Sequence, residues 1–333
     1  MSLLRGLALL CVQLLTPIVT ADEPDDLPPT HSLEPLLYAT GFEFAEAPAL
    51  DPQGNLYAAN YRFLGTIGRI TADGTASIWC DLRQRSPVEG RQVQAGGIKV
   101  DAEGRLIVAD AGGGRLLRVA TTGQQVEVLA DRFEGSRFIS VSDVALDLKG
   151  NIYFTDAGAL ISETADKLTG SVYRYDIQTK QMARLASGLA CPNGLAVSPD
   201  QMYLCVAESQ RFRILLFDVN TKTGDLQNQR VLMAFPYETR GNVITGQFVP
   251  DGMVFDARGR LYVAMWYGGV INVIDVPSGK LLRQYDAGGS QATGCHFSGA
   301  YLYVAVAAKE AVFRLKIDVP GHEYVTRSPV PGS

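Results

Sequence analysis

Oxygen-bearing side chains recur at one fixed position in this sequence, always five residues before a short polar turn. The position is occupied in turn by Glu46, Gly96, Ser142, Asn193, Asp251 and Thr293, so that only the glycine lacks a side-chain oxygen. Carboxylate, amide and hydroxyl oxygens are the ligands that hard divalent cations such as calcium prefer. Each residue could instead cap the end of a strand, but capping does not explain the common register. The pattern therefore predicts a divalent-metal site.

The turns belong to a unit that the chain repeats six times. The copies begin at residues 51, 101, 147, 198, 256 and 298 and read "DPQGNLYAAN", "DAEGRLIVAD", "DLKGNIYFTD", "SPDQMYLCVAE", "DARGRLYVAMW" and "SGAYLYVAV". Short alternating strands around a tight turn, repeated every 42 to 58 residues, are typical of propeller blades of about four strands. The sequence predicts an all-β, six-bladed β-propeller over residues 33–318, with "LEPLLYAT" completing the last blade. The side chains five residues before the turns should then meet at one end of the central axis, in a central metal site.

Three further residues differ from the small or apolar side chains around the predicted site. Asp143 follows Ser142 at a position where the other copies carry Gly or Ala. It could be a metal ligand, an outer partner of the ligands or a general base. Lys99 and His296 stand two residues before their turns, and each either reaches the channel or is held inside the fold.

At these residues the chain resembles the gluconolactonase, senescence-marker-protein and luciferin-regenerating-enzyme family of six-bladed propellers. The resemblance runs from about residue 41 to residue 318, and its motifs are "FAEAPALDPQGNLY", "SDVALDLKGNIYFTD", "CPNGLAVSPDQMYLCVAE" and "PDGMVFDARGRLYVAMW". It implies that Glu46, Asn193 and Asp251 bind one catalytic divalent ion, calcium in the first place, with zinc, magnesium or manganese as alternatives. Relatives place Asn or Asp where this chain has Ser142. The fourth ligand could therefore be Ser142, Asp143 or water.

The second strand of each blade should end at the face where the metal ligands meet. Side chains at these ends would line the rim of a substrate pocket, with His296 near the channel, and they are Tyr61, Arg62, Asp110, Asp156, Glu208, Trp266 and Tyr267. Two long connections at the same face, residues 157–170 and 233–250, could form a lid. Each rim residue could equally be an ordinary loop side chain.

The resemblance implies hydrolysis of lactones, small-molecule substrates. A bound divalent ion polarises an ester carbonyl and lowers the pKa of a water, whose proton Asp251 or Asp143 could accept. No G-x-S-x-G motif is present, and three histidines leave little for a Ser-His-Asp system. We therefore expect a metal-dependent hydrolase, a lactonase, with Asp251 and Asp143 as catalytic residues. A binding or sensing propeller with a structural metal, and a phosphotriesterase-type hydrolase, are the alternatives.

The two ends of the chain differ from the repeats. Residues 1–21, with Arg5 before an apolar run, indicate a signal peptide, residues 22–32 a linker and residues 319–333 a tail. The apolar run is too short to serve as a lasting membrane anchor, so we expect an exported monomer, periplasmic or secreted. A net charge of −5 without a basic run argues against binding to nucleic acid. The four later cysteines form one disulfide or stay as packed thiols.

Overall fold

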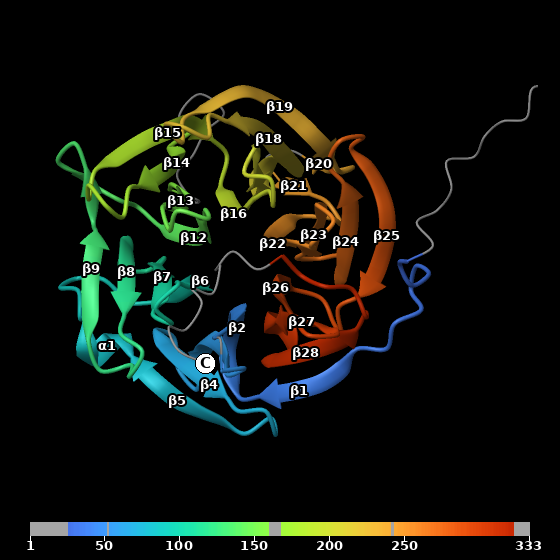
Figure 1. The fold of residues 1–333 in the computed structure, drawn as a ribbon, viewed down its shortest axis with the longest axis horizontal. Helices are drawn as coiled ribbons and strands as arrows, with labels where there is room; N and C mark the ends of the chain where they lie inside the picture. The colour runs from blue at the N-terminus through green and yellow to red at the C-terminus, as the bar shows by residue number, and fades with distance from the viewer. Residues whose placement is uncertain (1–25, 52, 160–167, 241–242, 323–333) are drawn as a thin grey trace, which may run out of the picture.

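Six four-stranded antiparallel sheets stand around one axis (Figure 1). The structure is a computed structural model, and it describes residues 26–51, 53–159, 168–240 and 243–322. The predicted six-bladed β-propeller is confirmed. The innermost strands of blades 1 to 6 are β2, β6, β12, β16, β22 and β26.

The blades follow one another along the chain. Blade 1 contains β2 (Phe42–Leu50), β3 (Leu56–Tyr61), β4 (Thr66–Ile70) and β5 (Ala76–Asp81), and blade 2 contains β6 (Ala95–Val100), β7 (Leu106–Asp110), β8 (Arg115–Val119) and β9 (Val126–Ala130). Blade 3 contains β12 (Val141–Leu146), β13 (Ile152–Asp156), β14 (Gly170–Tyr175) and β15 (Met182–Leu189), and blade 4 contains β16 (Pro192–Val197), β17 (Tyr203–Glu208), β18 (Arg213–Val219) and β19 (Leu226–Ala234). Blade 5 contains β22 (Pro250–Phe255), β23 (Arg260–Met265), β24 (Val270–Asp275) and β25 (Lys280–Asp286).

Blade 6 closes the ring with strands from both ends of the chain. It contains β26 (Ala292–Ser298), β27 (Tyr301–Val306), β28 (Ala311–Lys316) and, from the N-terminal side, β1 (Leu36–Thr40). β1 pairs antiparallel with β28 and places Leu36 opposite Arg314. The segment "LEPLLYAT" therefore completes the last blade, as its sequence predicted.

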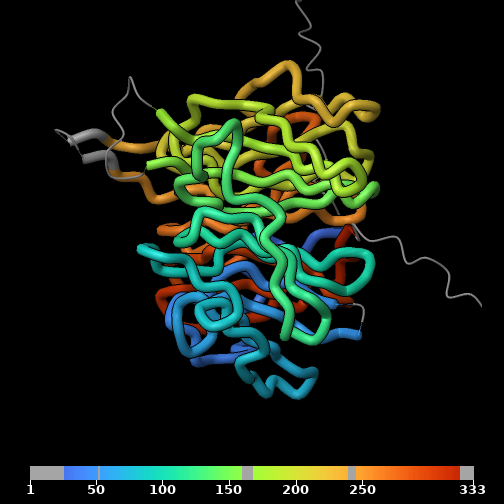
Figure 2. The backbone as a smooth tube through the Cα atoms, turned by 90° about the vertical axis from the view of Figure 1, so that its left-hand side faces the viewer, coloured from blue at the N-terminus to red at the C-terminus, as the bar shows by residue number. Residues whose placement is uncertain are grey.

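Few elements lie outside the blades. They are the pairs β10 (Arg132–Phe133) with β11 (Ser136–Arg137) and β20 (Glu238–Arg240) with β21 (Val243–Thr245), the one-turn helix α1 (Leu82–Arg85), and the 3-10 turns η1 (Ser209–Arg211) and η2 (Ala307–Lys309). Figure 2 shows the ring from the side, with blade 1 in blue at the bottom and blade 4 in yellow at the top. The proposed lid residues 160–167 and 241–242 lie outside the described part of the chain. Among the described residues, no helix is long and apolar enough to cross a membrane.

The tight turns are held by their own aspartates. Asp51 Oδ1 accepts hydrogen bonds from the backbone N–H groups of Gln53 and Asn55, at 3.0 and 2.9 Å. The equivalent bonds recur in the copies that begin at Asp101, Asp147 and Asp256. The glycine that follows, Gly54 in the first copy, adopts a φ of 82°, which favours glycine over other residues. These bonds explain why the "DxxG" pattern marks the turn in blades 1, 2, 3 and 5, whereas the turns of blades 4 and 6 begin with Ser198 and Ser298.

Each innermost strand has a β-bulge near its start. The pairing register shifts between Val141 and Val144 in β12, and similar shifts occur in the other five innermost strands. A bulge adds one residue to the strand and changes which side chains share a face. The residue two before the turn, such as Lys99, can therefore face the axis together with the residue five before it.

The innermost strands approach one another so closely that only glycine fits between several of them. A methyl group on Gly194 would lie 2.2 Å from the carbonyl oxygen of Asp251, and one on Gly252 would lie 2.6 Å from that of Thr293. A methyl group on Gly97 would lie 1.9 Å from Oδ1 of Asp143. Glycine four positions before the turn is thus required by the narrow centre of the ring in blades 2, 4 and 5.

Both end segments are in part bound to the propeller. In the expected linker, Leu27 is buried, and the carbonyl oxygen of Pro28 accepts a 2.9 Å hydrogen bond from the hydroxyl of Tyr285 in β25. In the expected tail, Val319 is buried and Gly321 bridges to Asp256. Residues 1–25 and 323–333, which include the proposed signal peptide, lie outside the described residues. Cys80, Cys191, Cys205 and Cys295 form no disulfide with one another in the described part of the chain.

Candidate active site in the central cavity

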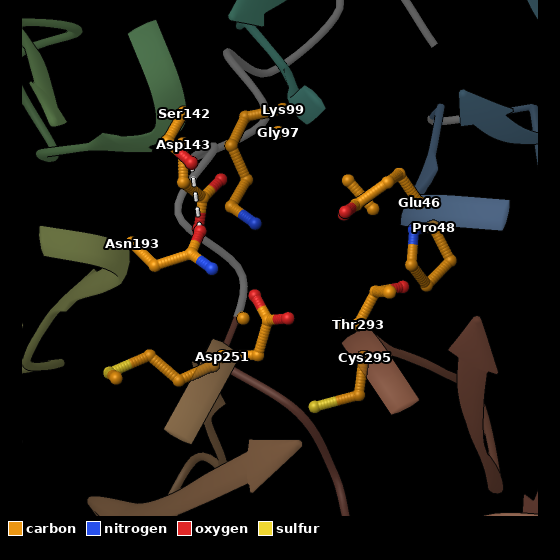
Figure 3. Close-up of a pocket in the computed structure, with 14 residues that line it drawn as sticks. Glu46, Pro48, Gly97, Lys99, Ser142, Asp143, Asn193, Asp251, Thr293 and Cys295 are labelled. Carbon is orange, nitrogen blue, oxygen red and sulfur yellow. Dashed lines mark hydrogen bonds between the residues drawn. The ribbon is translucent and has the colours of Figure 1, made fainter. Parts of the chain in front are cut away.

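All five oxygen-bearing residues that stand five positions before a turn line one cavity at the centre of the propeller (Figure 3). β2 supplies Glu46, β12 Ser142, β16 Asn193, β22 Asp251 and β26 Thr293. The cavity is lined in addition by Asp143, Lys99, Gly97 and Cys295, among others. The residues that share one position in the sequence repeats therefore lie around one cavity in the structure.

Hydrogen bonds orient Asn193 in this cavity. The Ser142 hydroxyl donates to Asn193 Oδ1 at 2.9 Å, and the Thr155 hydroxyl donates to the Asn193 carbonyl oxygen at 2.8 Å. The Asn193 amide also lowers the pKa of the neighbouring Asp251 carboxyl, against the larger effect of burial. Since Ser142 uses its proton in this bond, the lone pairs of its oxygen stay available to a cation.

The carboxylates of Glu46 and Asp251 line the same cavity, and no positively charged side chain of the described residues pairs with Glu46. Burial, followed by the charges of Asp251 and Asp143, raises the pKa of Glu46 well above its ordinary value. Burial and the charge of Asp143 likewise raise the pKa of Asp251. No hydrogen bond or ion pair joins the Glu46 carboxylate to any residue in the described ranges. A divalent cation between the two carboxylates would offset both causes, because an opposite charge favours the ionised forms.

Asp143 connects three blades. Its Oδ1 accepts a hydrogen bond from the N–H of Val144 at 2.8 Å, and its Oδ2 accepts one from the N–H of Leu195 in β16 at 3.3 Å. The side chain covers Gly97 of β6. Burial raises the pKa of Asp143, whereas the positive charge of Lys99 and the two N–H donors lower it. Asp143 is thus both a brace between the innermost strands and a charged group on the cavity wall.

Thr293 and His296 of blade 6 have other roles than the carboxylates. The Thr293 hydroxyl donates to the carbonyl oxygen of Ala45 at 2.8 Å and so ties blade 6 to blade 1. His296, expected near the channel, is not among the residues that line the cavity. Its Nδ1 is buried without a partner among the described residues. Burial, reinforced by the charge of Lys99, lowers the pKa of His296 to about 3, so the ring is neutral.

The donor set fits a hard divalent cation in chemistry. Three carboxylates, one amide and the hydroxyl side chains of Ser142 and Thr293 line one cavity, and oxygen groups of these kinds are the ones that calcium prefers. In the described part of the chain, however, no three His, Cys, Asp or Glu side chains stand close enough to hold one ion as placed. Carboxylates without a cation between them repel one another, which favours separate positions. The metal site predicted from the sequence therefore stays a prediction.

Asp110, Asp156 and Glu208 lie at the ends of second strands, where their carboxylates bind other groups of the protein. Asp110 accepts hydrogen bonds from the N–H groups of Gln94 and Gly113 and forms an ion pair with Arg115, 2.6 Å from its Nη2. In the same way Asp156 binds the N–H groups of Ile139 and Ser140, and Glu208 binds the N–H of Ala190 and the guanidinium of Arg213. All three are buried. Their carboxylates brace the connection before the innermost strand, and their expected contact with substrate stays a prediction.

Tyr61 is also inside the fold. It is 4% exposed, packs edge to face on Phe42 at 5.2 Å and donates its hydroxyl proton to the carbonyl oxygen of Ala76 at 2.9 Å. Arg62 is exposed and places its guanidinium over the Tyr61 ring, 5.0 Å from the centroid. Tyr61 is therefore a packing residue between blades 1 and 6, contrary to the expectation from the sequence.

Trp266 and Tyr267 are the remaining rim residues. Trp266 is partly buried and its ring centroid lies 5.7 Å from that of Phe44, which precedes Glu46 by two residues in β2. Tyr267 is 61% exposed, and its ring centroid is 6.2 Å from that of Trp266. Phe44 thus joins blade 1 to blade 5 beside the carboxylate Glu46. Sequence analysis missed it, since an aromatic residue in a strand looks like any core position.

Asp110→Ala tests the assignment of the buried carboxylates as braces. The change leaves the buried guanidinium of Arg115 unpaired, so we expect the free energy of unfolding to fall by about 3–5 kcal/mol. Urea denaturation would measure it. The fraction of Asp110→Ala protein that is folded should open lactones as fast as the parent protein.

Glu127→Ala is the matched control, because it breaks an exposed ion pair with Arg118. We expect a loss of less than about 1 kcal/mol there. If Asp110→Ala unfolds like the parent protein but loses turnover, Asp110 contacts substrate after all.

The chain matches the model of the SMP-30/gluconolactonase/LRE-like region over residues 91–308. The chain belongs to this family. A gluconolactonase from Zymomonas mobilis is 26% identical over 289 residues, which cover 84% of this chain and 80% of that protein. A lactonase drp35 from Staphylococcus saprophyticus is 27% identical over 268 residues, 76% of this chain and 74% of that protein. Membership in the SMP-30/gluconolactonase/LRE-like family supports a lactonase, and hence a hydrolase that acts on a small molecule.

Solved structures in the same family share the fold. A gluconolactonase from Xanthomonas campestris superposes with a TM-score of 0.71 at 24% identity, over 89% of this chain and 96% of that chain. A calcium-binding protein, regucalcin, from Agrobacterium tumefaciens superposes with a TM-score of 0.71 at 18% identity, over 91% and 100% of the two chains. At these identities the likeness concerns the propeller itself.

Proposed function

We propose that this protein is an exported lactonase that depends on one divalent metal ion, calcium in the first place. The observation that carries the proposal is the convergence of Glu46, Ser142, Asn193 and Asp251 on one cavity in a chain of a lactonase-like family. The calcium-binding regucalcin with the same fold adds support for a divalent ion. Zinc, magnesium and manganese are the alternatives to calcium.

The cavity residues have distinct parts in this proposal. A bound divalent ion supplies a Lewis acid that polarises the lactone carbonyl and makes a water more acidic. Glu46, Asn193 and Asp251 would hold the ion, with the Ser142 oxygen as fourth ligand. Asp251 or Asp143 accepts the proton of the attacking water, since both carboxylates lie on the cavity wall. Ser142 keeps the Asn193 amide oxygen turned into the cavity.

Side chains with exposed surface outside the cavity are candidates for binding the substrate. Arg62, Trp266 and Tyr267 stay candidates for contact with a lactone, because they keep exposed or partly exposed surface. Residues 1–21, with Arg5 before an apolar run, carry the proposal of export to the periplasm or the medium. Mass spectrometry of the protein after expression with its leader would test cleavage after Ala21.

Lactone turnover should depend on a divalent ion. We expect a panel of sugar and aliphatic lactones to include at least one that the purified protein opens. Treatment with EDTA should lower turnover about 100-fold or more, because the Lewis acid and the acidified water are lost together. Adding calcium should restore it. Proton release in a weak buffer measures ring opening.

Two other outcomes would change the assignment. Hydrolysis of a phosphotriester in the same panel, without turnover of lactones, would indicate the phosphotriesterase-type alternative. Calcium binding by calorimetry with no turnover of any ester would indicate a binding propeller with a structural ion.

A further inference from the structure

One ammonium group stands among the carboxylates of the central cavity. Lys99 comes from β6, two residues before the turn at Asp101, where the bulge of this strand directs its side chain to the axis. Figure 3 shows the side chain extending into the middle of the cavity, between Asp143 and Asn193 on one side and Glu46 on the other. Its charge acts on Asp143, Cys295 and His296.

We propose that Lys99 sets the charge of the metal site, so that the site selects divalent over trivalent ions and stays folded without any ion. The inference rests on the proposed function, because it needs a metal ion at the cavity. It assigns to Lys99 a role in ion selectivity that differs from that of the ligands, since its positive charge repels the ion.

The charges on the cavity wall support this role. The charged side chains that line the cavity are Glu46, Asp143, Asp251 and Lys99. Three ionised carboxylates alone would exceed a divalent ion by one negative charge. With the Lys99 ammonium the excess disappears, and the site with a divalent ion is neutral. His296 adds no charge, since its pKa is about 3.

Lys99 is not bound to one carboxylate. No ion pair or hydrogen bond joins its ammonium to a side chain within the described ranges of the chain. A shared counter-charge acts on all three carboxylates at once and can repel an ion at the centre. By Coulomb's law this repulsion is 1.5 times larger for a trivalent than for a divalent ion at the same place.

Lys99→Met therefore tests the inference through ion binding. We expect the calcium affinity to rise about tenfold, and the terbium affinity about thirty-fold, since the repulsion scales with the charge of the ion. Isothermal calorimetry measures both, with calcium and terbium chlorides as the probes. In EDTA, thermal unfolding should start at lower temperature in Lys99→Met than in the parent protein, and calcium should restore it.

Two control variants separate charge from structure. Lys99→Arg keeps the positive charge and should keep the ratio of terbium to calcium affinity of the parent. Lys149→Met removes an ammonium group from an exposed turn outside the cavity and should leave both affinities unchanged. If Lys99→Met does not fold even with calcium, Lys99→Gln is tested in the same way.

The outcomes distinguish the inference from the proposed function. A parent protein that binds no divalent ion contradicts the proposed metal dependence, and the inference falls with it. A parent that binds one calcium ion, with Lys99→Met or Lys99→Gln at the same affinities for calcium and terbium, overturns the role of Lys99 alone. A gain in affinity that is larger for terbium than for calcium supports the role of Lys99 in ion selectivity.

Discussion

Replacing Asp251 by asparagine should abolish metal binding and lactone turnover together. The amide keeps the shape of the side chain but removes one of three negative charges in the cavity. Calcium affinity should fall about 100-fold or more, because a neutral oxygen is a weaker ligand for a hard cation. Turnover at fixed calcium should fall by about 10²–10⁴, since the ion and a candidate general base are both impaired. Calorimetry and a lactone assay measure the two effects.

The stability of the Asp251→Asn protein without metal is a separate test. Burial and the neighbouring Asp143 disfavour the charged form of Asp251, so removing the charge should not lower the melting temperature in EDTA. Asp73→Asn changes the same chemical group in an exposed turn of blade 1 and should alter neither binding nor turnover. An Asp251→Asn protein with parental affinity and turnover would refute the proposed site.

The propeller could be predicted because its signals are local. Each blade repeats a strand, a tight turn and a second strand, and in four blades an aspartate binds two backbone N–H groups of the turn that it begins. Alternation of apolar side chains then fixes which strand faces fall between blades. Even the closing strand β1 was visible, since the last copy lacked a fourth strand and "LEPLLYAT" had no other partner.

The roles of the rim carboxylates could not be predicted from their positions alone. The end of a second strand can turn a carboxylate to a substrate or back to the chain, and the sequence is the same in both cases. One signal was nevertheless present. Asp110 and Glu208 are each followed five residues later by an arginine, Arg115 and Arg213, which pairs with them across the next strand. Removal of one partner from such a buried pair leaves the other charge uncompensated, which favours a structural role for the acid.

The place of Lys99 depended on a feature of the backbone. Strict alternation puts the residues two and five positions before the turn on opposite faces. The bulge between Ala95 and Ile98 changes this order, and no residue type announces it in the sequence. Recurrent bulges in all six innermost strands are visible only in the structure, which is why Lys99 stayed ambiguous.

Asp143 has one role predicted from the sequence and a second role seen in the structure. The sequence places a carboxylate next to Ser142, which suggests a base for the attacking water. The structure adds hydrogen bonds from the N–H groups of Val144 and Leu195 and a tight contact over Gly97. A brace and a base make different predictions for the same substitution, so the two can be separated.

Asp143→Ala should lose most lactone turnover while calcium affinity falls less. Loss of a residue that contacts a metal ligand typically lowers metal affinity or activity about 10–100-fold. For Asp143→Ala we expect a loss of turnover of about 100-fold and a loss of calcium affinity of about 10-fold. Two backbone N–H groups lose their acceptor, so the free energy of unfolding should also fall by about 1–3 kcal/mol. Asp143→Asn keeps one acceptor oxygen and should recover part of this stability but little turnover. Kinetics, calorimetry and urea denaturation on the two variants measure the three quantities.

Two outcomes would change the role of Asp143. A loss of stability with unchanged turnover would make Asp143 a brace between blades only. Equal losses of affinity and turnover would make it a direct ligand of the ion.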